Sequence, residues 1–304
     1  MGIREFLLTA VSEENLQEQV SMKEYTTFRA GGPARWFVTP QNEQELAAVL
    51  AVCRTHEVPY LVLGRGSNLL IGDGGFDGAV LSMRKGFDQV IIDRDAGVMD
   101  VQAGVMMPTA AAKALEAGFE GLEFASGIPG TIGGGILMNA GAYGGELGQI
   151  LIDVTVLDPD GTVRTVTAEE AALSYRHSAF IGSGMVILSC RLQLTPCDRL
   201  SIRAKMDDFN GRRREKQPLE FASAGSTFKR PAGHFAGKLI EDAGLKGYSV
   251  GDAQVSEKHA GFVINRGNAS AAEIRAVCEH VAQTVKEIHG VELELEVQLA
   301  GIFK

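Results

Sequence analysis

A run of glycines between residues 126 and 146 constrains this chain more than any other part of its sequence. Eight of these twenty-one residues are glycine, and glycine lets the backbone turn tightly or come close to another group. Neither a helical nor a strand periodicity runs through the segment, so we predict an irregular loop. Gly133, Gly134 and Gly135 would let a flat ring or a pyrophosphate approach the main chain. The alternative is a turn-rich region without a ligand.

A second glycine loop, LGRGSNLL at 63–70, directly follows a predicted strand at 60–63. Such a loop could present several backbone N–H groups to an anion. It is not a Walker loop, because no Gly-Lys-Ser/Thr ends it, and Leu69 stands where GxGxxG has its third glycine. A tight structural turn is the alternative. Two glycine loops on separate segments suit a long ligand with two ends, such as the dinucleotide FAD.

Composition excludes several classes of function. The 304 residues, 45% hydrophobic and 22% charged, are typical of a globular protein with room for more than one core. A formal net charge of -9 opposes nucleic-acid binding, which depends on Lys and Arg at the phosphates. The four cysteines form no CxxC pair, so we expect buried free thiols and no metal site. They are Cys53, Cys190, Cys197 and Cys278.

The N-terminal residues lack the basic start and long apolar core of a signal peptide. No apolar stretch reaches the roughly twenty residues of a membrane-spanning helix. We therefore expect a soluble, cytoplasmic protein that does not insert into a membrane.

Three consecutive segments of mixed helix and strand are predicted, at 1–80, 81–206 and 207–304. The first contains a helix at 43–56, capped by Asn42, ahead of the strand at 60–63. The inward face of that helix carries Leu46, Val49, Leu50 and Cys53.

The middle segment is richer in strands. Strands are predicted at 98–104, 151–158 and 162–167, the last two joined by the turn residues DPDG. One short helix begins at Pro108 and ends at Gly118, and another begins at the capping box of Thr167 and Glu170.

The third segment contains the clearest helix, which begins at Ser270 with Glu273 in capping-box register and ends at Gly290. Its inward face is predicted to carry Ile274, Val277, Cys278, Val281, Val285 and Ile288. A final strand is expected at 291–301. Alternation along it puts Leu293, Leu295 and Val297 on one face, and Glu292, Glu294 and Glu296 on the other, toward water.

The motif YRHSAF at 175–180 contains the first candidates for chemistry. Arg176 is always charged at neutral pH, so it suits holding a substrate carboxylate or stabilising negative charge during a reaction. His177 is either an acid–base group or a hydrogen-bonded structural residue. The basic stretch RRREK at 212–216 could meet the charge of a phosphorylated small molecule or form a solvated helix face.

Ser226 lies in the loop SAGSTFKRPAG at 223–233, which has no GxSxG nucleophile elbow. Its hydroxyl would donate a proton only with neighbours that relay or stabilise the transfer, and a turn-forming serine is the alternative. Lys216, Lys229 and Arg230 bracket the loop and could face either phosphate or water.

Taken together, these segments resemble one family, the UDP-N-acetylenolpyruvoylglucosamine reductases. Seven blocks occur in the family's order over nearly the whole chain. They are TTFRAGGPA at 26–34, LGRGSNLLI at 63–71, the glycine run at 126–146, YRHSAF at 175–180, SAGSTFKRP at 223–231, DAQVSEKHAGFVIN at 252–265 and LELEVQLAG at 293–301.

The resemblance implies an α+β protein. A two-subdomain FAD-binding fold of the vanillyl-alcohol-oxidase type, at 1–80 and 81–206, precedes a smaller α+β substrate-binding domain at 207–304. The residues that the resemblance implies near FAD are Gly64, Arg65, Gly66, Ser67, Asn68, Gly127, Ile128, Pro129, Gly130, Thr131, Gly133 and Gly134.

The implied reaction is the NADPH-dependent, FAD-mediated reduction of UDP-N-acetylglucosamine enolpyruvate to UDP-N-acetylmuramate, in peptidoglycan precursor synthesis. By resemblance, Arg176 is the catalytic arginine, Ser226 the proton donor and Glu296 the catalytic carboxylate. Further substrate contacts implied are Tyr175, Lys216 and Lys229. The expected partners are these small molecules, and the expected state is a monomer or a weak oligomer.

The chain departs from the family pattern at two places. YRHSAF runs straight into IGSGMVIL, without the insertion that carries a substrate-covering tyrosine in longer members, so the chain resembles the short subgroup. Leu295 and Gln298 stand where the family often has proline and a basic residue, which leaves Glu294 as the other candidate carboxylate. An oxidase of the same flavin fold and a non-catalytic sugar-nucleotide-binding protein are the competing interpretations.

Overall fold

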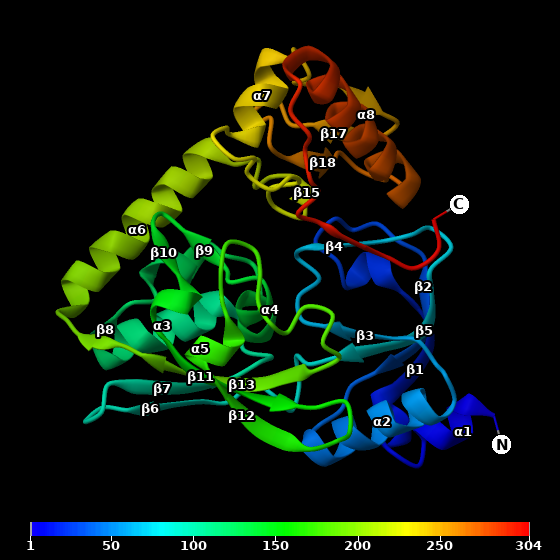
Figure 1. Ribbon diagram of the computed structural model, residues 1–304, viewed down its shortest axis with the longest axis vertical. Helices are drawn as coiled ribbons and strands as arrows, with labels where there is room; N and C mark the ends of the chain where they lie inside the picture. Colours follow the sequence, from blue (N-terminus) through cyan, green and yellow to red (C-terminus); the bar gives the residue numbers. More distant parts are fainter. Residues whose placement is uncertain (1, 304) are drawn as a thin grey trace. The chain divides into compact units, whose positions relative to one another are not determined.

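The computed structural model describes residues 2–303 (Figure 1). The chain forms two compact units, each assembled from segments that are separate in the sequence. The first unit holds the residues up to Gln17 together with 36–65 and 79–213. The second holds 18–35, 66–78 and the residues from Arg214 on. The division into domains at 1–80, 81–206 and 207–304 stays a prediction.

A five-stranded antiparallel sheet forms the centre of the first unit, in the order β12-β11-β13-β7-β6. Its strands are β6 (Val90–Asp93), β7 (Val98–Gln102), β11 (Leu151–Leu157), β12 (Val163–Thr167) and β13 (Val186–Gln193). The predicted strands at 98–104, 151–158 and 162–167 are confirmed as β7, β11 and β12. The turn DPDG joins β11 to β12 as predicted, and Leu157 pairs with Val163 beside it.

Short helices accompany this sheet. α3 (Met107–Ala117) ends at Gly118, whose φ of +83° is left-handed, and α5 (Ala168–Ala171) begins with the capping box of Thr167 and Glu170. Both predictions are confirmed. The remaining elements of this region are β8 (Phe119–Glu120) paired with β14 (Thr195–Pro196), η3 (Glu123–Gly127), α4 (Ile132–Leu137), β9 (Gly141–Ala142) paired with β10 (Gly145–Glu146), and η4 (Leu147–Gln149).

The N-terminal part contains α1 (Ile3–Leu7), η1 (Glu13–Asn15), η2 (Met22–Glu24) and α2 (Glu43–Thr55). The Asn42 side chain caps α2 by accepting a hydrogen bond from the backbone N–H of Glu45 at 2.9 Å, as predicted. The predicted inward face of α2 is buried. A second sheet has the order β1-β2-β5-β3, in which β3 lies parallel to β5. Its strands are β1 (Leu16–Ser21), β2 (Pro33–Val38), β3 (Tyr60–Leu63) and β5 (Phe76–Ser82).

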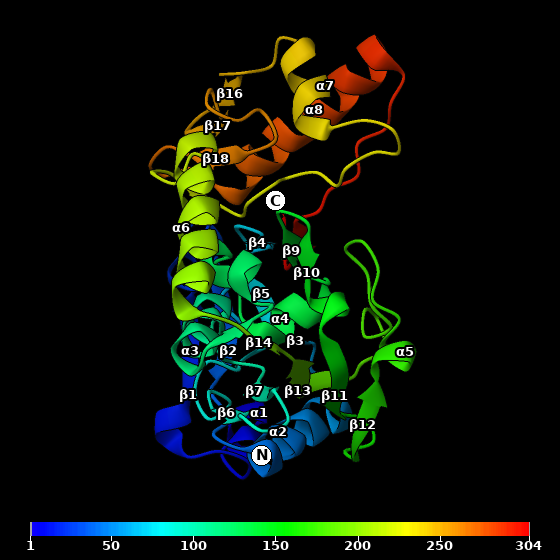
Figure 2. The ribbon, with the colours of Figure 1, turned by 90° about the vertical axis from the view of Figure 1, so that its left-hand side faces the viewer.

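The second unit contains a four-stranded antiparallel sheet in the order β15-β18-β17-β16, against which α8 packs (Figure 2). Its elements are β15 (Ala222–Ser223), α7 (Ala236–Asp242), β16 (Ser249–Val250), β17 (Ala253–Val255), β18 (Val263–Asn265) and α8 (Ala271–His289). The capping box of Ser270 and Glu273 and the end at Gly290 confirm the prediction for α8. The prediction for Ile288 was wrong: it is 56% exposed, because the helix projects beyond its core in the last turn.

The C-terminal segment is less regular than predicted. Only β19 (Gln298–Ala300) is a regular strand, and it pairs in parallel with β4 (Leu69–Ile71). The alternation of side chains is nevertheless confirmed, because Val297 is buried in the core, Leu293 and Leu295 pack against it, and Glu292 and Glu294 are exposed. Glu296 is half-buried, contrary to the expectation that all three carboxylates face water.

One long helix, α6 (Arg199–Lys216), carries the basic stretch RRREK at its C-terminal end. Arg212 lies on the exposed side and forms an ion pair with Asp208 at 2.7 Å. Arg213 is half-buried, and burial lowers the pKa of its guanidinium. The stretch is therefore neither wholly solvated nor gathered on one face.

Three cysteines, Cys53, Cys190 and Cys278, are buried free thiols as predicted, whereas Cys197 is half-buried. Within residues 2–303, no helix combines the length and apolar character needed to cross a bilayer.

Candidate functional site

The two predicted cofactor loops meet in the first unit at Gly64 and Thr131. A Cβ atom on Gly64 would lie 2.3 Å from Thr131 Oγ1, so only glycine fits at the end of β3. Thr131 is buried and caps α4, because its hydroxyl accepts a hydrogen bond from Gly134 N–H at 3.4 Å. The sequence predicted both loops but contained no sign that they touch.

The prediction that the glycine run is an irregular loop was wrong in part, because α4 forms within it. Two of its three consecutive glycines serve packing inside the protein. A Cβ on Gly133 would lie 2.8 Å from the Ala103 side chain, and one on Gly135 would lie 2.8 Å from Leu147. Only Gly134 is open, with its nearest neighbour at 3.6 Å. Protein thus fills the side-chain positions of Gly133 and Gly135, and the approach of a ligand to the main chain of the three glycines stays a prediction.

The start of the same run lies against α6. A Cβ on Gly127 would be 2.6 Å from Asn210 Oδ1 and 2.9 Å from Arg213 Nη1. Asn210 also donates to Ser126 Oγ at 3.2 Å. The following residues, Ile128 to Gly130, lie between this contact and the cap of α4, at the surface or half-buried.

The second half of the other loop, Gly66 to Asn68, belongs to the second unit. Gly66 has a left-handed φ of +66°, and a Cβ there would lie 2.2 Å from the carbonyl oxygen of Tyr25. Its own carbonyl accepts from Thr27 N–H at 3.1 Å. The block TTFRAGG therefore fixes the turn of GRGSN, whose Arg65 and Ser67 side chains are half-buried.

Arg176 sits at the apex of a tight turn in the first unit. Its φ of +53° lies in the left-handed region, which is uncommon for a residue with a side chain. Ser174 and His177 close the turn by exchanging backbone hydrogen bonds at 3.1 Å. The guanidinium lies 5.1 Å from the centre of the Tyr175 ring. Tyr175 is 52% exposed, and His177 is exposed.

This turn is tied to α4. Ser178 is buried and donates to the carbonyl oxygen of Leu137 at 2.8 Å, and Asn139 donates from its amide to the carbonyl oxygen of Ser174 at 3.2 Å. Both anchors come from the helix that carries the open Gly134 or from its C-terminal end. The structure thus links the Arg176 turn to the glycine run, which the sequence did not indicate.

In the second unit, the structure brings Ser226 and Glu296 onto neighbouring segments. The backbone N–H of Glu296 donates to the carbonyl oxygen of Thr227 at 2.9 Å, and Lys229 N–H donates to the carbonyl oxygen of Glu294 at 2.8 Å. Thr227 is fully buried, and its hydroxyl accepts from Val263 N–H at 2.9 Å. Ser226, the residue before it, is exposed.

Asn68 also holds the Glu296 segment. Its side-chain amide donates to the carbonyl oxygen of Glu296 at 2.9 Å, and its backbone carbonyl oxygen accepts from Gln298 N–H at 3.0 Å. Thr227 and Asn68 are the positioning residues that sequence reasoning missed as such. The signal was slight, since Asn68 was predicted only as a cofactor contact and Thr227 lies directly beside Ser226.

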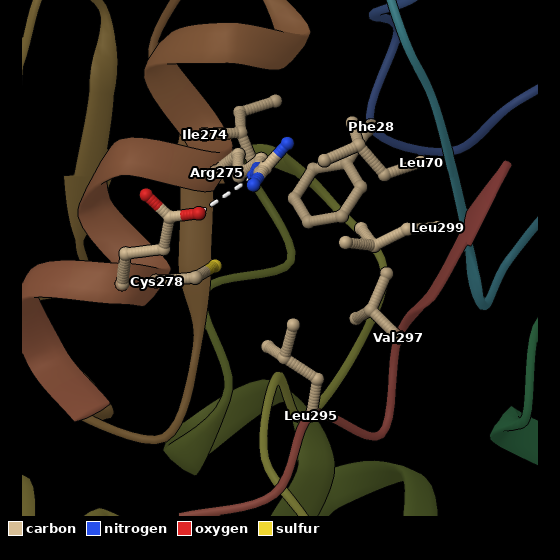
Figure 3. A pocket seen from close by; sticks show the side chains of 9 residues that line it. Phe28, Leu70, Ile274, Arg275, Cys278, Leu295, Val297 and Leu299 are labelled. Carbon is tan, nitrogen blue, oxygen red and sulfur yellow. Dashed lines mark hydrogen bonds and ion pairs between the residues drawn. The ribbon is translucent and has the colours of Figure 1, made fainter. Parts of the chain in front are cut away.

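The two candidate carboxylates differ in their surroundings. The Glu294 side chain is 72% exposed and forms an ion pair with Lys229. Glu296 is half-buried. Its neighbours in sequence, Leu295 and Val297, pack into the core of the unit (Figure 3). Glu296 is thus the better placed of the two for a shielded role. Lys216, at the end of α6, is exposed.

The comparisons with known proteins cover both parts of the chain. A family model described as an FAD binding domain matches residues 34–167, and one described as the C-terminal domain of UDP-N-acetylenolpyruvoylglucosamine reductase matches residues 217–300. These matches confirm the predicted α+β class, in which an FAD-binding fold precedes a smaller C-terminal domain.

Relatives with the same name match over almost their full length. The UDP-N-acetylenolpyruvoylglucosamine reductase of Agathobacter rectalis is 48% identical over 298 residues, 95% of each chain. That of Clostridium novyi is 46% identical over 301 residues, 99% of this chain and 97% of the relative. The crystal structure of the reductase from Thermus caldophilus is 36% identical with a TM-score of 0.80, over 94% of this chain and 99% of that one.

Proposed function

This chain belongs to the family of UDP-N-acetylenolpyruvoylglucosamine reductases, and from that premise we propose how its residues divide the work. The reaction is the flavin-dependent reduction of UDP-N-acetylglucosamine enolpyruvate to UDP-N-acetylmuramate, a step of peptidoglycan precursor synthesis. The observation that carries the assignment is the sequence identity to reductases of this family along nearly the whole chain. NADPH is the proposed source of the electrons.

The residues Gly64 to Asn68 and Gly127 to Gly134 hold FAD in this proposal. The fit rests on the contact of Gly64 with the Thr131 side chain, which brings the two loops together, and on the open face of Gly134. FAD, when bound, supplies the transfer of hydride from NADPH to C3 of the enolpyruvyl double bond. The protein's own residues must then manage the charge and the proton.

Arg176 binds the substrate carboxylate and stabilises the negative charge that develops at C2 and over this carboxylate. A fixed guanidinium lowers the energy of such charge more than water does, because it needs no reorganisation during the reaction. Its left-handed backbone costs about 1–3 kcal/mol, a strain found often at functional sites. The anchors from Ser178 and Asn139 hold the turn against that cost.

Ser226 donates the proton to C2, and Glu296 supports the enolic intermediate by hydrogen bonding. The support for this pairing is the backbone hydrogen bond between Glu296 and Thr227, which sets the serine and the acid on adjacent segments. The exposure of Ser226 leaves its hydroxyl accessible to a substrate. Tyr175, Lys216 and Lys229 are proposed substrate contacts, and Lys229 would exchange its partner Glu294 for a phosphate. The cytoplasmic location and the monomeric or weakly oligomeric state stay predictions.

The test is NADPH oxidation by the purified yellow protein, with and without UDP-N-acetylglucosamine enolpyruvate. Turnover should require the sugar nucleotide. Rapid aerobic turnover without it would favour the oxidase, and a colourless protein without flavin absorbance would favour the sugar-nucleotide-binding protein.

Rapid mixing then separates the two halves of the reaction for Ser226→Ala. The variant should keep the rate of flavin reduction by NADPH and lose about a hundredfold or more in flavin reoxidation by substrate, the range of a general acid's contribution. Ser223→Ala, in the same loop, is the matched control and should leave both rates unchanged. A variant blocked in the first half and normal in the second would contradict the role of Ser226.

A further inference from the structure

A cavity of about 110 Å³ lies inside the second unit, between α8 and the segment that carries Glu296 (Figure 3). α8 contributes Ile274 and Cys278 to its wall. The opposite side contains Phe28 and Leu70, together with Leu295 and Val297. These six side chains are buried or half-buried, whereas Leu299, Arg275 and Glu279 are exposed at the rim, so the cavity opens to the surface of this unit.

The lining favours a neutral, apolar occupant. Burial raises the pKa of the Cys278 thiol to about 12, so this side chain is uncharged at neutral pH. The charged groups at the edge, Arg275 and Glu279, form an ion pair with each other at 2.6 Å. An ionic ligand would have to break that pair, whereas an apolar one would leave it in place. Apolar walls of this kind favour an apolar occupant, because such a group loses contact with water when it enters.

The size limits the occupant further. An engineered apolar cavity of about 150 Å³ binds benzene, and the cavity here is somewhat smaller. A single ring of about six non-hydrogen atoms is therefore the largest apolar group that this comparison allows. The Phe28 side chain offers such a ring an aromatic neighbour (Figure 3).

The cavity and the proposed active site share a segment of chain. Leu295 and Val297 form part of the wall, and Glu296 lies between them with its backbone N–H bonded to Thr227. Side chains that line a void lack neighbours on one side and can adjust into it. A ring that fills the void would remove this freedom from the two residues that flank the carboxylate.

We propose that this cavity is a binding site for a small neutral apolar ring, and that its occupancy slows substrate reduction by restraining the segment that carries Glu296. The binding site stands on the cavity alone. The effect on rate rests on the proposed function.

Binding is tested on the full-length, FAD-loaded protein with benzene as the probe. At ten times its dissociation constant, benzene should lower the unfolding equilibrium constant about elevenfold, seen as a rise in the unfolding midpoint. Cys278→Phe places a ring in the cavity and should abolish the response. If Cys278→Phe does not fold, Cys278→Leu takes its place. Leucine fills the cavity in part, so this variant should weaken the response. Cys197→Ala, in the first unit, is the control and should respond like the wild type.

An unchanged wild-type midpoint, or an equal response in Cys278→Phe and the wild type, would overturn the binding site. For the coupling, benzene should slow flavin reoxidation by substrate at least threefold and leave flavin reduction by NADPH unchanged. Benzene that binds without slowing reoxidation would overturn the link to Glu296. If the ligand-free protein does not oxidise NADPH in the presence of the sugar nucleotide, the proposed function fails, while the binding result stands.

Discussion

Asn68 is one of the residues proposed to lie near FAD, but its side-chain amide is bonded to Glu296, so its removal should damage the chemistry through Glu296. Its side chain donates one hydrogen bond, at 2.9 Å, to the backbone carbonyl oxygen of Glu296, while its backbone carbonyl oxygen accepts a hydrogen bond from Gln298 N–H. Asn68→Ala removes only the first contact. A neutral hydrogen bond of this kind contributes about 0.5–1.5 kcal/mol. If that energy serves to position the carboxylate, flavin reoxidation by substrate should slow about two- to tenfold, since 1.36 kcal/mol is a factor of ten.

Asn68→Asp sharpens the prediction, because its effect should depend on pH. At pH 7.5 an ionised carboxylate would face the carbonyl oxygen of Glu296, so both groups would be acceptors and the loss should exceed that of Asn68→Ala. A protonated carboxyl has nearly the shape of the amide and can donate in its place. The rate of Asn68→Asp relative to Asn68→Ala should therefore rise as the pH falls toward 5. This ratio removes the pH dependence that the two variants share.

The assay is rapid mixing of the NADPH-reduced enzyme with substrate between pH 5 and 8, with FAD content measured for every variant. Asn268→Ala, at an exposed asparagine of the same unit, is the control and should match the wild type. Normal reoxidation by Asn68→Ala would refute the positioning of Glu296. So would loss of FAD with unchanged reoxidation in the molecules that retain it, because Asn68 would then act on the cofactor alone.

Three further predictions follow from the packing. Gly64→Ala should lower the FAD content of the purified protein, measured as the ratio of flavin to protein absorbance, because the added Cβ would lie 2.3 Å from Thr131 Oγ1. The double variant with Thr131→Ala should regain part of the flavin, and full flavin content in Gly64→Ala would contradict the clash. Asp73→Ala should lower the free energy of unfolding by about 2 kcal/mol in denaturant titrations, because this carboxylate accepts two backbone N–H groups of the first turn of α8, both at 2.8 Å; Asp77→Ala, which removes an exposed ion pair, should cost less than about 1 kcal/mol, and equal losses would argue against the cap. Burial lowers the pKa of His259 below its usual 6.5, so the unfolded state binds the proton more readily than the folded state. The contribution of His259 to the free energy of unfolding is therefore complete above about pH 6.5 and is lost as the pH falls through the lower folded-state pKa. His259→Gln should flatten the fall in unfolding free energy between pH 7.5 and 5, and an unaltered slope would assign that fall to other groups.

The local elements could be predicted because their signals lie within a few residues of one another. The capping boxes at Thr167 and Ser270 and the left-handed glycines at 118 and 290 all satisfy backbone groups next to them in sequence. The strands β11 and β12 likewise follow from alternation and an intervening turn. Family identity could be predicted for a related reason, since seven ordered blocks are a property of the sequence itself.

The errors and omissions lie where the outcome depends on distant residues. Gly133 and Gly135 look like open backbone in the sequence, but Ala103 and Leu147 occupy the space beside them. Ile288 keeps the helical spacing of its inward neighbours and is exposed because no core reaches that turn. The choice between Glu294 and Glu296 likewise depends on burial and on Lys229, not on register alone.

The sequence by itself thus determined the family, the cofactor class and most of the secondary structure of this protein. Only the tertiary structure decided which glycines pack against protein, how Asn68 and Thr227 hold Glu296, and where a cavity lies behind that residue. The reason is physical: caps and periodicity are satisfied within a few residues, whereas steric room, burial and the partners of a long-range hydrogen bond exist only after segments more than two hundred residues apart have packed together.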